Sequence, residues 1–265
     1  MENDKKKNGN CWVACFDILG FGNDVEQFPP EHVLEQYIKV LKETEWRDVS
    51  HKWFSDCFVF YTKDDSESSF RSIDVALKFF FHRMFTQCIP MTGCLDIGKF
   101  YVDEGKGIFF GRSLVNAHRW VEGQDWIGFV LSERVRKKIA EFKVKYPNGY
   151  WDEFKKHYLN YPVPCKKGIK RKLLVYKLTI NPYAGGQQAK LDRCTLWNCW
   201  GDMKAKARIL LKAKRKGINS IEYKNVIRKY KNTKEFLLRA YPALKEITKN
   251  GKCDSVNPWQ SVSKK

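Results

Sequence analysis

The sequence of 265 residues lacks the features that mark membrane and secreted proteins. No apolar run approaches the roughly 18 residues of a membrane-spanning helix. The longest candidate, residues 75–85, is interrupted by Lys78 and Arg83. The amino-terminal residues are charged and polar, which argues against a secretory signal. These absences predict a soluble, cytoplasmic protein with no membrane partner.

The nine cysteines show no metal-binding or redox spacing. The close pairs are Cys11/Cys15 and Cys194/Cys199, and neither has the two-residue gap of a zinc ribbon or a redox motif. Cys11 and Cys15 lie in an apolar stretch, where a thiol behaves as a small hydrophobic side chain. The sequence therefore predicts reduced cysteines in the core and no zinc site.

Acidic residues are scarce relative to basic ones, 30 against 49, so the net charge is +19. Residues 191–265 hold 19 basic and 6 acidic residues, a net of +13, which leaves +6 for residues 1–190. Such a surface is either a solvated helical face or a contact for nucleic acid or another polyanion. Solvation is the commoner explanation, and nucleic-acid binding through residues 191–265 is the alternative.

Hydropathy patterns predict an α+β fold in which helices cover a mixed, mostly antiparallel sheet. Apolar or alternating segments indicate the strands, and apolar residues at helical spacing indicate the helices. Strands are expected at residues 11–21, 51–62 (two strands joined by a tight turn), 92–102, 108–110, 126–131 and 162–180 (a hairpin). Helices are expected at residues 31–41, 70–88, 111–122, 132–146 and 150–160.

A domain boundary is expected after residue 180, because a proline and two adjacent glycines there interrupt the alternation of strands and helices. We expect an α+β domain over residues 1–183 and a basic helical extension over residues 184–265. Trp197 and Trp200 are expected to dock the extension onto the domain. The extension's helices are expected at residues 203–216, 221–230 and 233–248.

Two aspartates suggest metal chemistry. Asp17 lies in the apolar run CFDILGF, and Asp56 lies in the turn between two aromatic strands. A carboxylate among apolar neighbours is costly unless it is paired or bound to a cation. Strand-end carboxylates on adjacent strands suit Mg²⁺, which prefers a few carboxylates together with substrate phosphates. Backbone N–H groups of residues 20–22 are suited to contact such phosphates. Taken alone, Asp56 is also explained as an ordinary turn residue.

Five short segments follow one another between residues 11 and 180. They are FDILGFG (16–22), HKWFSDCFVF (51–60), GCLDIGKFYV (93–102), IFFGRSLVNAHRWVE (108–122) and KKGIKRKLLVYKL (166–178). In their order and spacing they resemble the catalytic domain of class III nucleotidyl cyclases, the adenylate and guanylate cyclase family. The resemblance implies a homodimer that holds two active sites between its subunits and acts on a nucleoside triphosphate.

The resemblance implies that Asp17 and Asp56 hold two Mg²⁺ or Mn²⁺ ions, helped by the Ile18 carbonyl oxygen. Ser55 stands where the family has glycine, and Gly22 stands where it has a hydroxyl-bearing residue. The implied substrate-binding residues are Leu19, Gly20, Phe21, Gly22, Lys52, Phe54 and Lys99.

Cationic residues are implied to stabilise the transition state. Arg119 matches the family's catalytic arginine, and Lys167 is assigned to the phosphate-binding lysine, with Lys166 or Lys170 as alternatives. Asn116 is the candidate for the helix asparagine. It precedes Arg119 by three residues, where the family has four.

The base-binding residues depart from the purine cyclases. Lys52 stands at the position of a purine-reading lysine, but apolar Ile108 aligns with its acidic partner. Trp53 and Phe54 crowd the same hairpin. The pattern resembles the pyrimidine cyclases of bacterial Pycsar anti-phage systems. This implies conversion of UTP or CTP to the 3′,5′-cyclic monophosphate and pyrophosphate. The alternatives are an adenylate or guanylate cyclase and a catalytically silent nucleic-acid-binding protein.

Overall fold

The computed structural model describes residues 6–27, 29–43, 46, 48–179, 186–213 and 220–249. Its strands are β1 (Lys6–Ile18), β2 (Val49–Phe54), β3 (Cys57–Thr62), β4 (Met91–Asp103), β5 (Ile108–Gly111), β6 (Gly128–Leu131), β7 (Tyr158–Pro164) and β8 (Lys170–Tyr176). Its helices are α1 (Phe21–Gln27), α2 (Pro30–Glu43), α3 (Glu67–Thr86), α4 (Arg112–Gly123), α5 (Glu133–Lys145), α6 (Tyr150–His157), α7 (Gly186–Ala213), α8 (Ser220–Ala240) and α9 (Leu244–Lys249), with a 3-10 turn at Lys166–Gly168.

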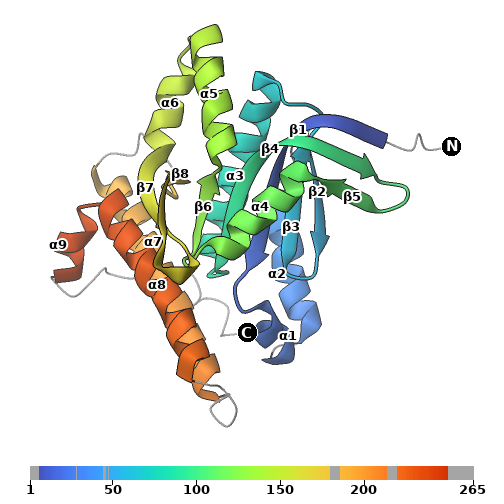
Figure 1. Ribbon diagram of the computed structural model, residues 1–265. Coiled ribbons are helices and arrows are strands. Elements are labelled where there is room, and N and C mark those ends of the chain that lie inside the picture. Colours follow the sequence, from blue (N-terminus) through green and yellow to red (C-terminus); the bar gives the residue numbers. More distant parts are fainter. Residues whose placement is uncertain are drawn as a thin grey trace.

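The strands form one sheet in the order β2-β3-β1-β4-β6-β8-β7, with β5 paired to β4 (Figure 1). The β4–β6 pair is parallel, and the other strand pairs of the sheet are antiparallel. Helices cover this sheet, so the predicted α+β class with a mixed, mostly antiparallel sheet is confirmed.

Strand β1 gives the sheet two different faces, because successive side chains of a strand point to opposite sides. Trp12, Ala14 and Phe16 belong to the large core that also contains the buried side of α3. Cys11 and Val13 belong to a smaller cluster with β4 and β5. Helix α4 packs across β1 and β4 (Figure 1). Asp17 continues the alternation of Cys11 and Val13, so it lies on their face of the sheet.

The first strand and its exit differ from the prediction. The strand begins at Lys6 because Lys6 pairs with Asp103 of β4, and it ends at Ile18. Gly20 then adopts a φ of 87°, so the glycines after the apolar run do turn the chain, and the next residues form α1, a helix that the sequence pattern did not indicate.

The C-terminal extension shares the hydrophobic core of the sheet. Trp200 of α7 is buried in that core, as predicted, and its indole N–H donates to the Tyr230 carbonyl oxygen at 3.0 Å. Phe236 of α8 packs edge-on against the stacked rings of Trp126 and Tyr161, with 5.0 Å between the centroids of Phe236 and each of them.

The predicted helix limits of the extension were wrong. Helix α7 begins at Gly186, well before the expected residue 203, and its described part ends at Ala213. Residues 214–216 of the expected helix, and residues 181–185 of the expected domain boundary, lie outside the described residues. Helix α8 runs without a break through residues 231 and 232 and ends at Ala240, and Leu244–Lys249 forms the separate helix α9, so the expected helix at residues 233–248 is divided between the two.

The cysteines that the structure describes form no disulfide, and Cys11, Cys15, Cys94, Cys194 and Cys199 are buried, as predicted for cysteines of the core. Among the described residues, no helix combines the length and the apolar character that crossing a membrane requires.

Candidate active site

The sheet register places Asp17 and Asp56 beside each other. Asp17 is the penultimate residue of β1 and lies opposite Cys57 of β3. The N–H of Ile18 donates to the Asp56 carbonyl oxygen at 2.9 Å, which extends the ladder between the two strands by one bond. The two carboxylates that the sequence singled out therefore occupy neighbouring strand ends.

The turn before Asp56 has a left-handed backbone. Ser55 has a φ of 54°, in the region that glycine adopts without strain. Phe54 and Cys57 pair across the two-residue turn, and the indole N–H of Trp53 donates to the Ser55 carbonyl oxygen. Ser55, which stands where the family has glycine, thus has a backbone conformation that glycine adopts readily. This turn conformation positions Asp56.

The electrostatics of the two carboxylates favour a bound cation. Burial raises the pKa of the Asp17 carboxyl, and repulsion from Asp56 raises it further, whereas Lys229, His118 and Lys166 oppose the rise. A divalent ion would relieve this repulsion and bring further coordination sites for phosphate oxygens. In the described part of the chain, no group of three or more His, Cys, Asp or Glu side chains is placed to hold a metal. The assignment of the two aspartates and the Ile18 carbonyl oxygen as metal ligands stays a prediction.

The turn after β1 contains the residues that the sequence predicts to contact phosphate. The Leu19 N–H already donates to the Pro90 carbonyl oxygen at 2.8 Å, so this amide is committed within the protein. The Gly20 carbonyl oxygen accepts from the Asp24 N–H at 3.2 Å in the first turn of α1. No heavy atom lies within 4 Å of the Cβ position of Gly22, so there is space beside Gly22 and the start of α1, where Phe21 also lies.

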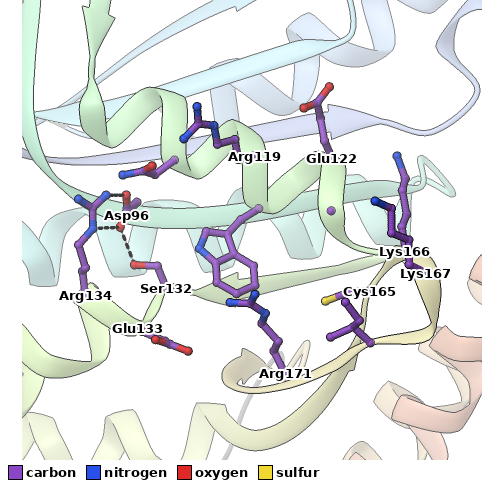
Figure 2. A pocket seen from close by; sticks show the side chains of 14 residues that line it. Asp96, Arg119, Glu122, Ser132, Glu133, Arg134, Cys165, Lys166, Lys167 and Arg171 are labelled. Carbon is purple, nitrogen blue, oxygen red and sulfur yellow. Dashed lines mark hydrogen bonds and ion pairs between the residues drawn. The ribbon is translucent and has the colours of Figure 1, made fainter.

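A pocket of about 690 Å³ lies between α4, the start of α5 and the β7–β8 turn (Figure 2). Predicted and alternative site residues meet here: Arg119 and Asn116 come from α4, and Lys166 and Lys167 come from the turn. Lys167 has a φ of 65°, so the turn is tightly bent at this residue. The basic residues that line the pocket are Arg119, Arg134, Lys166, Lys167 and Arg171.

Sequence reasoning assigned no role to the residues that shape the other walls of this pocket. Buried Asp96 accepts hydrogen bonds from the Ser132 hydroxyl at 2.6 Å and from Arg134 Nε at 3.1 Å, and it forms an ion pair with Arg134 (Figure 2). The Arg171 guanidinium lies 5.4 Å from the centre of the Trp120 ring. The position of Asp96 in the middle of a strand was the available signal, because strands rarely contain aspartate.

The remaining predicted residues lie outside this pocket. Lys52 is exposed on β2, with its ammonium 5.8 Å from the centre of the Phe109 ring. Phe54 is 83% exposed at the end of the β2–β3 hairpin. Lys99 pairs with Asn10, seven residues along β1 from Asp17, which corresponds to roughly 24 Å along the strand. Lys99 and Asp17 are thus separated within one chain, and the phosphate contact of Lys99 stays a prediction.

One chain does not enclose the candidate site. The residues that line the pocket include neither Asp17 nor Asp56. His118, one residue before Arg119, is exposed on α4 and lies near Glu122, with 3.6 Å between Nδ1 and the carboxylate. The site therefore has an acidic half at the ends of β1 and β3 and a basic half at α4 and the β7–β8 turn.

Comparisons with known proteins give a likeness in fold. No protein-family model and no curated protein matches the sequence. The chain is similar to the catalytic core of a rhodopsin-guanylyl cyclase with converted specificity in complex with ATPalphaS, at a TM-score of 0.45 and 14% identity over 65% of this chain and 98% of that one. It is also similar to an adenylate/guanylate cyclase/hydrolase from Silicibacter pomeroyi, at a TM-score of 0.41 and 14% identity over 65% and 97% of the two chains. At these scores the likeness adds nothing to the chemistry of the site, which stands on its own residues.

Proposed function

We propose that the protein is a nucleotide cyclase that converts a nucleoside triphosphate to its 3′,5′-cyclic monophosphate and pyrophosphate. The observation that carries this proposal is the position of Asp17 and Asp56 at neighbouring strand ends. The basic pocket that contains Arg119 and Lys167 supports it, because that pocket suits a polyphosphate. The cyclase motifs supply these residues in the family's order.

Each residue of the site has a role in this reaction. Asp17, Asp56 and the Ile18 carbonyl oxygen would hold divalent cations, which when bound activate the ribose 3′-hydroxyl and offset charge on the α-phosphate. As the 3′ oxygen bonds to the α-phosphorus, the bond to pyrophosphate breaks and the hydroxyl proton passes to solvent. Arg119 and Lys167 stabilise the charge on the departing pyrophosphate, and Asn116 orients the ribose.

We infer further that the active enzyme is a homodimer. In one chain the acidic and basic halves do not share a pocket. Each half also carries an exposed apolar side chain: Phe54 is 83% exposed beside Asp56, and Val115 is 48% exposed beside Asn116. Ile169, in the pocket lining, is 51% exposed. Exposed apolar side chains around a site favour a partner surface, and two-fold symmetry would then form two equivalent sites.

The base is proposed to be a pyrimidine, so that UTP or CTP is the substrate. Apolar Ile108 offers no hydrogen-bond partner to a base. Trp53 and Phe54 are bulky side chains on the hairpin where the base is expected, which favours the smaller pyrimidine ring. The product, cyclic UMP or cyclic CMP, is proposed to act as a second messenger in anti-phage defence, as in the Pycsar systems.

The test is to incubate the purified protein separately with ATP, GTP, CTP and UTP, with Mg²⁺ and with Mn²⁺, and to identify products by mass spectrometry. We expect cyclic UMP or cyclic CMP, and none from an Asp56→Asn variant. An Asp152→Asn variant, altered at an exposed carboxylate of α6, should keep full activity. Cyclic AMP or cyclic GMP would contradict the pyrimidine assignment, and the absence of any cyclic product would contradict the cyclase proposal.

A further inference from the structure

Helix α8 of the basic extension is fixed to the sheet domain next to the acidic half of the site. Arg228 forms an ion pair with buried Asp125, and Asn232 Nδ2 donates to the Asp125 carbonyl oxygen at 2.6 Å. The Thr233 hydroxyl accepts from the Ile127 N–H at 2.8 Å. These contacts hold α8 in one orientation at the start of β6.

The strand register relates this contact to Asp17. Gly128, the first residue of β6, pairs with Thr92 of β4, and Thr92 pairs with Asp17 of β1. Two strand spacings of about 4.8 Å thus separate Asp17 from the start of β6, where α8 is attached. Lys229 precedes Thr233 by one helical turn, so it lies on the same side of α8 as the contact with Ile127.

Lys229 is a cation without a paired carboxylate. Its side chain is partly buried, yet in the described part of the chain Lys229 forms no ion pair. Asp125 of the sheet domain is already paired with Arg228, the neighbour of Lys229 on α8. Burial lowers the pKa of the Lys229 ammonium and Lys166 lowers it further, while Asp17 and Asp125 oppose this. Lys229 therefore lies within electrostatic reach of both Asp17 and the basic β7–β8 turn. A partly buried cation in this position is favourable when an anionic ligand binds beside it.

We propose that α8 brings Lys229 to the Asp17 end of the sheet to bind phosphate oxygens of the nucleoside triphosphate. The extension thereby adds a cation to the acidic half of the polyphosphate site. This inference rests on the proposed cyclase function for the identity of the ligand. It gives a ligand-binding role to α8, which lies outside the residues that resemble the cyclases.

The test compares three variants of the full chain: Lys229→Gln, Lys229→Arg and Lys231→Gln. Lys231 is exposed on the same helix, so its variant removes the same charge without touching the site. Calorimetry measures binding of UTP, CTP, ATP and GTP and of the corresponding monophosphates, and the unfolding midpoint checks that each variant is folded.

We expect Lys229→Gln to weaken binding of the preferred triphosphate roughly tenfold or more, since contacts to charged groups contribute on this scale. The monophosphate should bind almost unchanged, Lys229→Arg should restore most of the affinity, and Lys231→Gln should match wild type. Equal triphosphate affinity in Lys229→Gln and wild type would overturn the inference, as would equal losses for triphosphate and monophosphate.

The same measurements separate the two proposals. If the wild type binds a triphosphate through Lys229 but forms no cyclic product, the cyclase proposal fails and the inference about Lys229 stands. If cyclic product forms at the wild-type KM in Lys229→Gln, the inference fails alone. If the wild type binds none of the four triphosphates, both are contradicted.

Discussion

Replacing Thr233 with valine tests how firmly the extension is attached to the sheet. Thr233 is fully buried, and its hydroxyl accepts from the Ile127 N–H at 2.8 Å and lies 2.9 Å from the Lys229 carbonyl oxygen. Valine has nearly the same shape but leaves the buried Ile127 N–H without its hydrogen-bond partner. The cost of such an unsatisfied donor is about 2 kcal/mol.

The assay is equilibrium unfolding of wild type and variant, followed by fluorescence and by circular dichroism. A loss of about 2 kcal/mol corresponds to roughly 4–8 °C in the melting temperature of a domain of this size. Because Phe236 and Trp200 of the extension lie in the same core as the sheet, both signals should report one cooperative transition.

Thr86→Val is the matched control. The Thr86 hydroxyl donates to the Arg83 carbonyl oxygen of its own helix at 3.0 Å, so its removal leaves no N–H unpaired and should cost less than about 1 kcal/mol. A stability of Thr233→Val within about 0.5 kcal/mol of wild type would refute the attachment through Ile127. Separate transitions for the two signals would refute the shared core.

Three further predictions concern the site and the core. Ser55→Gly should stabilise the protein by up to about 1 kcal/mol in urea unfolding, because glycine adopts the φ of 54° without strain; a loss of stability would contradict this. Asp17→Asn should raise the melting temperature in EDTA at pH 7, because burial and then Asp56 disfavour the charged Asp17 carboxyl; Mg²⁺ or Mn²⁺ should stabilise wild type but not this variant. Burial lowers the pKa of His82 to about 4, below its usual value near 6.5, so the unfolded chain binds more protons between these values and stability should fall as the pH drops through this window. His82→Gln should weaken that fall, and an unchanged profile from pH 7 to pH 4.5 would show that His82 does not cause it.

Much of the fold could be predicted from local patterns, because alternating strands and amphipathic helices follow from side-chain periodicity. The β2–β3 hairpin with Asp56 in its turn is an example, since its aromatic residues flank a two-residue link. The first and last residues of a strand or helix could not be predicted where they depend on contacts with residues far away in the sequence. Strand β1 begins at Lys6 because β4 extends to Asp103 beside it, and α8 continues through Asn232 because Asp125 accepts its amide.

The residues of the site also divide into those that a local sequence signal reveals and those that it does not. Asp17 was recognisable because its apolar neighbours make an unpaired carboxylate costly. Arg134 and Lys229 carry no such local signal. Arg134 matters through Asp96, 38 residues earlier, and Lys229 is one of many lysines in a basic extension until α8 is placed beside β6. Partners this far apart in sequence become visible only when the chain is folded.

The most direct test of an active site shared between two chains is to mix two inactive variants. Asp56→Asn damages the acidic half, and Arg119→Ala damages the basic half, so each homodimer alone should be inactive. After mixing and subunit exchange, half of the dimers combine the two variants, and each of these has one site with both halves intact. We predict recovery of about a quarter of the wild-type cyclase activity per chain. Variants that stay inactive after subunit exchange is verified, or an active monomer, would contradict the account.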